Sequence, residues 1–229
     1  MNQRRLIASL AIALLAGCTL LLHTGCTAPT SGAAINSSEP DGILLRRAME
    51  RAERAGRTRD PIRAEALYRE ATNIYPGFAA AWNNLGLTLM EQDRWSEADE
   101  AFALASDLAA SDPRPLYNRG IVNDRLGRLE DALRDYAAAI AGSPRLLLWS
   151  YINHADCLAR LDRREEAIAS LTRLIDHPRA RPHDIATSLA HRGMYLAKVG
   201  RFDEATADFA RALDLQPTNF AAWYQRGVA

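Results

Sequence analysis

The residues best suited to chemistry in this sequence lie within one helical turn, at His154, Asp156 and Cys157. Imidazole, carboxylate and thiolate groups all bind zinc, which proteins usually hold with four ligands from two spaced pairs. The sequence offers no second pair with that spacing, and it has no glycine-rich phosphate loop and no GxSxG or HExxH motif. We therefore expect no metal site, no cofactor and no catalytic residue, and we interpret Cys157 as a thiol buried between helices.

The overall composition narrows the class of protein. Of the 229 residues, 48% are hydrophobic and 24% are charged, and the formal net charge is zero. Such a chain can bury one sizeable core and is too polar for several membrane spans. Because a neutral chain carries no basic field, we expect no nucleic-acid partner.

A short sequence pattern recurs from about residue 42 onward, and His154, Asp156 and Cys157 lie within it. An alanine is followed four residues later by a bulky residue and, in four of the five units, seven later by a small one, which places all three on one helix face. Successive first alanines are 34, 34, 35 and 38 residues apart, and they are Ala64, Ala98, Ala132, Ala167 and Ala205.

A second helical pattern precedes each of these alanines. Twelve residues before each alanine lies another small residue, in the series Ala52, Gly86, Gly120, Ala155 and Gly193. Turn segments such as EQDRW separate the two helices, and prolines, which cannot continue a helix, separate the units. The sequence therefore predicts helix–turn–helix hairpins of about 34 residues, with the glycines admitting a close contact that a side chain would prevent.

This pattern resembles the tetratricopeptide repeat family, in which an aromatic residue and Leu-Gly are followed by Ala, an aromatic residue, Ala and Pro. Residues 81–105 and 191–217 match it almost position for position. The resemblance covers residues 42–229 and implies an all-α protein, an α-solenoid whose hairpins stack into a right-handed superhelix. The predicted repeats are 42–78, which is degenerate, 79–112, 113–147, 148–182 and 183–217, followed by a partial repeat or capping helix at 218–229.

The resemblance places the first helix of each hairpin on a concave wall, where a partner would bind. Asn84, Asn118 and Asn153 form a column there, and their amides could hydrogen-bond the backbone of an extended peptide. Asparagine is also common at this position of the family, so a purely structural role stays open. The other inward positions are Leu87, Arg114, Tyr117, Ile121, Arg125, Trp149, Arg160, His191 and Met194.

One known partner class of the family does not fit. The carboxylate clamp for chaperone tails needs Lys and Asn at inward positions of one repeat, and the first repeat has Met49 and Glu53 there. No other run of three repeats restores the set. We therefore expect a protein or peptide partner other than a carboxylate-clamp chaperone tail.

The N-terminal residues resemble a bacterial lipoprotein signal. Arg4 and Arg5 precede an apolar run that ends in the sequence LAGC, at Leu15–Cys18, which resembles a lipobox. We predict a signal peptide at 1–17, lipidation of Cys18 and a disordered linker at 18–41. Lipidation of Cys26 after a later cleavage, or an uncleaved anchor formed by residues 6–22, are the alternatives.

These features predict a location and a function. The chain is expected to be exported and lipid-anchored to the bacterial cell envelope, at the outer membrane rather than the inner because Thr19 or Thr27 follows the candidate cysteine. The leading hypothesis is a non-enzymatic scaffold or adaptor that binds a peptide or protein in its concave groove. The alternatives are the N-terminal repeat portion of a longer enzyme or envelope-assembly protein, and a self-associating structural protein.

Overall fold

The helix signals of the sequence correspond to ten α-helices in the part of the chain that the structure describes. The structure is a computed structural model, and it describes residues 40–142, 147–219 and Trp223. The predicted signal peptide, Cys18, Cys26 and most of the predicted helix at 218–229 lie outside these residues. The helices are α2 (Pro40–Arg57), α3 (Pro61–Ile74), α4 (Ala79–Met90), α5 (Trp95–Leu108), α6 (Arg114–Arg125), α7 (Leu129–Gly142), α8 (Leu147–Arg160), α9 (Arg164–Ile175), α10 (Pro182–Lys198) and α11 (Phe202–Leu215).

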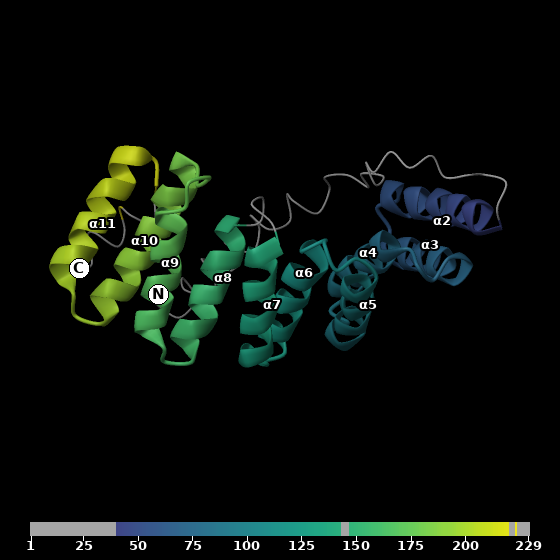
Figure 1. Ribbon diagram of the computed structural model, residues 1–229, viewed down its shortest axis with the longest axis horizontal. Coiled ribbons are helices and arrows are strands. Elements are labelled where there is room, and N and C mark those ends of the chain that lie inside the picture. The colour runs from purple at the N-terminus through teal and green to yellow at the C-terminus, as the bar shows by residue number, and fades with distance from the viewer. Residues whose placement is uncertain (1–39, 143–146, 220–222, 224–229) are drawn as a thin grey trace, which may run out of the picture.

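Consecutive helices pair into five hairpins that follow one another along the molecule (Figure 1). Each second helix packs against the first helix of the next hairpin, and the first helices also contact one another, α4 with α6, α6 with α8 and α8 with α10. The predicted all-α solenoid of helix hairpins is therefore confirmed. We call the layer formed by α4, α6, α8 and α10 the inner face, and the layer formed by the second helices the outer layer.

Three of the hairpins close where a glycine of the first helix meets an aromatic ring of the second. A Cβ atom added to Gly86 would lie 2.6 Å from the ring of Phe102, closer than real side chains approach. The predicted close contact at the glycines is confirmed, and the ring of the same hairpin occupies the space that the missing side chain leaves. The same 2.6 Å approach occurs at Gly120 with Tyr136 and at Gly193 with Phe209.

The turn inside each later hairpin passes through the left-handed backbone region. The φ angles are 57° at Asp93, 76° at Gly127, 63° at Asp162 and 83° at Gly200. Glycine adopts this conformation without steric cost, and aspartate is among the few other residues that do so in tight turns. The four residues lie at the same place in the repeat, so the turn geometry recurs with the repeat.

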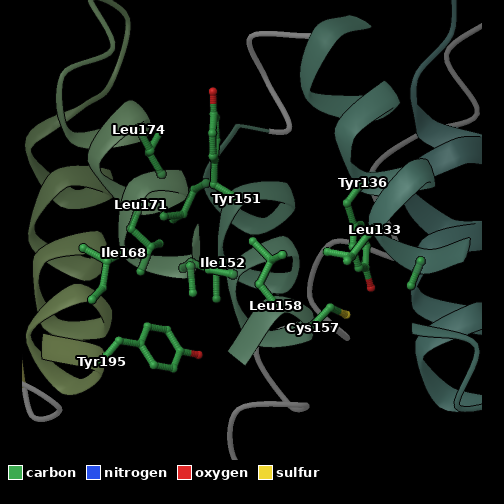
Figure 2. Close-up of a cluster of buried hydrophobic side chains, with 14 of the residues drawn as sticks. Leu133, Tyr136, Tyr151, Ile152, Cys157, Leu158, Ile168, Leu171, Leu174 and Tyr195 are labelled. Carbon is green, nitrogen blue, oxygen red and sulfur yellow. The ribbon is translucent and has the colours of Figure 1, made fainter. Parts of the chain in front are cut away.

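One hydrophobic core runs continuously through the last three hairpins (Figure 2). Leu133 and Tyr136 of α7 face Ile152 and Leu158 of α8, and the leucines of α9 close the cluster from the other side. Fully burying one such side chain contributes about 1.5–3 kcal/mol. Because the cluster draws on several hairpins, each hairpin is stable only when its neighbours cover its apolar faces.

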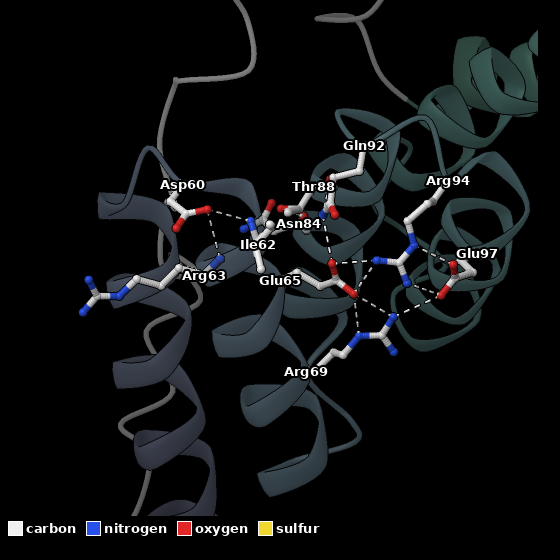
Figure 3. A network of polar contacts seen from close by, with 10 residues as sticks. All are labelled: Asp60, Ile62, Arg63, Glu65, Arg69, Asn84, Thr88, Gln92, Arg94 and Glu97. Carbon is white, nitrogen blue, oxygen red and sulfur yellow. Dashed lines mark hydrogen bonds and ion pairs between the residues drawn. The ribbon is translucent and has the colours of Figure 1, made fainter.

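Arginines link the second helices at the turn end of the hairpins. The guanidinium of Arg94, which lies in the turn before α5, donates at 2.7 Å to both carboxylate oxygens of Glu65 on α3 and at 2.5 and 2.6 Å to Glu97 on α5 (Figure 3). Arg69 bonds the same two glutamates, at 2.9 and 3.1 Å. The planar guanidinium suits this bidentate geometry better than an ammonium group.

The arginine recurs at the same position in each later hairpin. Each of these residues lies four positions before the first alanine of its second helix, and each reaches an acid on the preceding second helix. The pairs are Arg128 with Asp99 at 2.9 Å, Arg163 with Glu130 at 3.5 Å, and Arg201 with Glu165 at 3.2 Å. Some of the arginines of the chain therefore form ion pairs that connect one repeat to the next.

Candidate functional site: the inner face

The structure places the candidate binding residues on neighbouring helices of one layer. Each of the predicted positions lies on the first helix of its hairpin, and these helices contact one another. The positions are Asn84 and Leu87 on α4; Arg114, Tyr117, Asn118, Ile121 and Arg125 on α6; Trp149, Asn153 and Arg160 on α8; and His191 and Met194 on α10.

Two of the three asparagines, Asn118 and Asn153, are tied to the preceding hairpin through their amide nitrogens, whereas Oδ1 of Asn84 accepts from Asn83 of the same helix. The Nδ2 atom of Asn118 donates to Oδ1 of Asn83 at 3.0 Å, and Nδ2 of Asn153 makes a longer contact of 3.5 Å to the hydroxyl of Tyr117. The two pairs are equivalent in the repeat. Each acceptor lies three residues before the recurring small residue of its own helix (Gly86 or Gly120), and each donor lies two residues before the small residue of the next first helix (Gly120 or Ala155). The amide column is therefore also an inter-repeat connection. Within the described residues the carbonyl oxygen of Asn118 accepts no hydrogen bond, whereas the side chain of Asn153 also interacts with Tyr136.

His191 occupies the asparagine position of the last hairpin and lacks the matching partner. The residue that would accept its bond is Ile152, which has no polar atom in its side chain. The Nδ1 atom of His191 is buried and has no hydrogen-bond partner among the described residues. Burial lowers the pKa of His191 below its ordinary value, although nearby Asp156 acts in the opposite direction.

Two of the predicted inward arginines are held by carboxylates within the fold. Arg114 forms a bidentate pair with Asp112, at 2.6 to 3.0 Å, and Arg160 pairs with Asp124 of the preceding hairpin. Arg125 is different, since its guanidinium lies 5.4 Å from the centre of the Trp95 ring, a cation–π distance. The charges offered to a partner are therefore fewer than the sequence suggests.

Tyr195 links the last two hairpins of the inner face. Its hydroxyl donates to Asp156 of α8, and burial is the main reason why the pKa of Tyr195 lies far above its ordinary value. The ammonium of Lys198 lies 5.4 Å from the centre of the same ring. One carboxylate oxygen of Asp156 is thus engaged by a tyrosine of the next hairpin.

His154, Asp156 and Cys157, the residues first considered for metal binding, each have a different environment in the structure. The Nδ1 atom of His154 lies 3.1 Å from the hydroxyl of Ser170, and burial, aided by Arg173 and Arg163, lowers its pKa. Cys157 is fully buried in the core, and burial raises its pKa to about 12, so the interpretation as a buried thiol is confirmed. Within residues 40–142 and 147–219, no group of three His, Cys, Asp or Glu side chains is arranged to hold a metal ion.

Two aspartates of the second helices are buried instead of solvated. Asp135 and Asp208 are only 4% and 6% exposed. Arg119 binds Asp135 through Nε and Nη2 at 2.9 and 2.5 Å, and Arg192 binds Asp208 in the same way at 2.7 Å. A signal was present, because in both hairpins the arginine precedes the glycine and the aspartate follows 16 residues later.

Among the helices that the structure describes, not one combines sufficient length with sufficient apolar character to cross a membrane.

Family models match more than half of the chain. Residues 49–113 and 88–146 match one model described as Tetratricopeptide repeat, and residues 186–219 match another with the same description. A sequence relative is the DnaJ homolog subfamily C member 3 of Mus musculus, which is 32% identical over 92 residues. The match spans 40% of this chain and only 17% of that protein.

Solved structures with the same fold share little sequence with the chain. YrrB, described as a TPR protein with an unusual peptide-binding site, superposes with a TM-score of 0.63 at 19% identity, over 82% of this chain and 98% of YrrB. MamA superposes with a TM-score of 0.62 at 20% identity, over 69% of this chain and 90% of MamA. A tetratricopeptide repeat protein from Parabacteroides merdae gives 0.63 at 18% identity, over 82% and 71% of the two chains. At these identities the likeness concerns the fold alone.

Proposed function

The chain belongs to the tetratricopeptide repeat family, whose members mediate protein–protein interactions, and from this premise we propose that it is a non-enzymatic scaffold that binds an extended segment of a partner along its inner face. The observation that carries the proposal is the column of side-chain amides at Asn84, Asn118 and Asn153. Their repeat spacing offers one polar group per hairpin to a chain lying across the helices.

The hydrogen bonds of the column support this role. The Nδ2 atoms of Asn118 and Asn153 are directed to the preceding hairpin, which fixes the orientation of both amides. The Oδ1 atom of Asn118 then remains as an acceptor for a backbone N–H group of a bound segment. A polar group that is already oriented loses less conformational entropy on binding, so the contact contributes more to affinity.

Apolar side chains beside the column would supply most of the binding energy. Leu87, Ile121 and Met194 are partly buried and pack against buried hydrophobic side chains of the core, so their positions are fixed before a partner arrives. Trp149 lies beside them on α8 and is partly buried as well. We expect a segment with apolar side chains at alternate positions, because its backbone would face the amides while those side chains reach this apolar surface.

The cellular setting is a separate part of the proposal and rests on the N-terminal residues alone. We propose that the chain is exported and held at the envelope membrane by a lipid on Cys18, or on Cys26 if cleavage occurs later. Mass spectrometry of the detergent-extracted protein tests this part. A diacylglyceryl mass on one of the two cysteines is expected, and its absence from both would contradict lipidation.

The binding role is tested by changing two asparagines together. Asn118→Ala with Asn153→Ala removes both amides and leaves the aromatic packing between Tyr117 and Tyr136 intact, where the ring centroids are 6.0 Å apart. Asn73→Ala on the exposed surface of α3 is the matched control. Since each hydrogen bond contributes roughly 0.5–1.5 kcal/mol, recovery of the crosslinked partner from native envelopes should fall about tenfold with the double change and stay constant with the control.

A further inference from the structure

A polar cleft lies between α5, α6 and α7, at residues that the proposed inner-face site does not use. It has a volume of about 390 Å³ and is lined by residues that include Asp99, Glu100, Ala103, Arg119, Asn123 and Asp131. Small-ligand and side-chain pockets in proteins commonly have volumes of about 300–1,000 Å³. The cleft is therefore large enough for a side chain together with its flanking backbone.

The floor of the cleft is polar where the preceding hairpin is apolar. Leu85, Leu89 and Ala101 are buried in the second hairpin, and the residues at the same positions of the third hairpin are Arg119, Asn123 and Asp135. Asp135 accepts two bonds from Arg119 and a third, at 2.9 Å, from Nδ2 of Asn123. Replacing an apolar contact with charges costs desolvation free energy, so packing alone does not account for this exchange.

The last hairpin contains a closed version of the same arrangement. There Nη1 of Arg192 donates at 2.9 Å to the hydroxyl of Thr172 on the preceding helix, in addition to the pair with Asp208. In the third hairpin the preceding second helix is α5. There Ala103, which lines the cleft, occupies the position of Thr172. Within the described residues Nη1 of Arg119 accordingly makes no hydrogen bond.

The groups left over in the cleft define the guest that it would accept. Nη1 of Arg119 is a donor and Oδ1 of Asn123 an acceptor, and both belong to side chains that Asp135 holds in place. A carboxylate guest would be repelled by Glu100, whereas the other acids of the lining are already paired with its arginines. An ammonium guest would lie against Arg119, Arg128 and Arg134, which also line the cleft. A neutral carboxamide offers one acceptor and one donor side by side without adding charge.

We propose that this cleft is a second recognition site, in which the third hairpin binds a carboxamide side chain, Asn or Gln, of a partner protein. The guest oxygen accepts from Nη1 of Arg119, and its amide group donates to Oδ1 of Asn123. In the last hairpin the hydroxyl of Thr172 already satisfies the equivalent arginine nitrogen. Neither the apolar second hairpin nor the closed last hairpin offers this site, which extends the proposed function beyond the inner face.

The test is an NMR titration of the full chain with N-acetylglutamine methylamide. Saturable shifts are expected at the side-chain resonances of Arg119 and Asn123, with the millimolar affinity typical of so small a ligand. The glutamate analogue, which carries the rejected charge, should bind at least about fivefold more weakly. Absence of saturable shifts with the glutamine probe, or stronger binding of the glutamate analogue, would overturn the proposal.

Ala103→Thr is the decisive variant, because it copies the closed arrangement of the last hairpin. Its hydroxyl should accept from Arg119 and abolish the shifts while leaving the fold intact. Ala137→Thr makes the same change at the same position of α7, outside the cleft, and should leave binding unchanged. Full binding by Ala103→Thr would contradict the proposed geometry. The inner-face variant Asn118→Ala with Asn153→Ala should still bind the probe, so failure of one site is distinguishable from failure of the other.

Discussion

The side-chain amide of Asn118 donates a hydrogen bond of 3.0 Å to Oδ1 of Asn83 on the preceding hairpin. The same amide group is a candidate contact for a bound peptide, so the proposed function would give this residue a recognition role beside its structural one. The two roles use different atoms, since the nitrogen is directed to the neighbouring repeat and the oxygen remains for a ligand. Structural and functional explanations of the asparagine column are therefore compatible.

A double-mutant cycle tests the structural role. Asn83→Ala and Asn118→Ala are expected to be coupled, because either change alone removes the same hydrogen bond. The coupling free energy should be about 0.5–1.5 kcal/mol, measured by urea unfolding of the two single variants and the double variant. Strict additivity would show that the bond adds nothing to the junction between hairpins.

The small residue in each first helix gives a second prediction. Gly86→Ala should destabilise the protein by about 1–3 kcal/mol, because the new methyl group would lie 2.6 Å from the Phe102 ring. Gly127→Ala is the control for backbone strain, since its φ is 76° and no atom lies within 4 Å of the added Cβ. Its cost should be only about 1 kcal/mol. Equal unfolding midpoints for Gly86→Ala and the wild type would contradict the packing argument.

The buried ion pair in the third hairpin predicts non-additive behaviour. Arg119→Leu alone leaves Asp135, whose side chain is only 6% exposed, without its main partner. Such a change typically costs about 3–5 kcal/mol in a fully buried pair, and less is expected here because the Arg119 side chain is 26% exposed.

The triple variant Arg119→Leu, Asn123→Leu, Asp135→Ala recreates the apolar set of the second hairpin. It should be more stable than Arg119→Leu and close to the wild type. Thermal unfolding of the three proteins makes the comparison. A triple variant less stable than the single one would show that the polar cluster is needed for packing.

The fold could be predicted from the sequence because its determinants are local. The period of about 34 residues, Gly86 with its equivalents and the turn residues all act within one hairpin, and stacking then follows from the apolar faces that a single hairpin leaves uncovered. The pairing of Arg94 with Glu65 depends instead on how far one hairpin advances past the next. A sequence pattern does not specify that distance, so these inter-repeat bonds could not be predicted.

For the candidate residues, the helix that carries each one could be predicted from the sequence, but the hydrogen bonds and ion pairs that each one makes could not. Each candidate was assigned to a first helix, and the structure brings those helices together. Sequence alone did not reveal that Asp112 and Asp124 neutralise Arg114 and Arg160, because the distances depend on side-chain rotamers and on the neighbouring repeat. The only sequence signal for the ion pair of Arg119 with Asp135 was its spacing of 16 residues, which Arg192 and Asp208 share.

The stability of the protein should fall as the pH drops below about 6.5. Burial lowers the pKa of His191, so the unfolded chain takes up a proton at a higher pH than the folded protein does. The unfolded state then binds more protons, which stabilises it until the pH lies below the lowered pKa as well. His154, whose pKa is lowered too, adds to the same slope.

His191→Phe removes one of these groups together with its buried nitrogen that lacks a partner. The loss of unfolding free energy between pH 8 and pH 5.5 should become smaller, and stability at pH 8 should be retained or increased. Urea unfolding at the two pH values provides the measurement. An unchanged pH dependence in the variant would mean that His191 protonates equally in both states.

Site-specific photo-crosslinking tests the central claim most directly. A benzoylphenylalanine residue is placed at Leu87 or Arg125 on the inner face, or at Ile62 and Leu215 on α3 and α11, where the side chains are 72% and 40% exposed. If the inner face binds an extended partner segment, irradiated envelopes should yield the same partner adduct from positions 87 and 125 and none from the outer positions. Adducts at Ile62 or Leu215 with none at the inner positions would contradict the account.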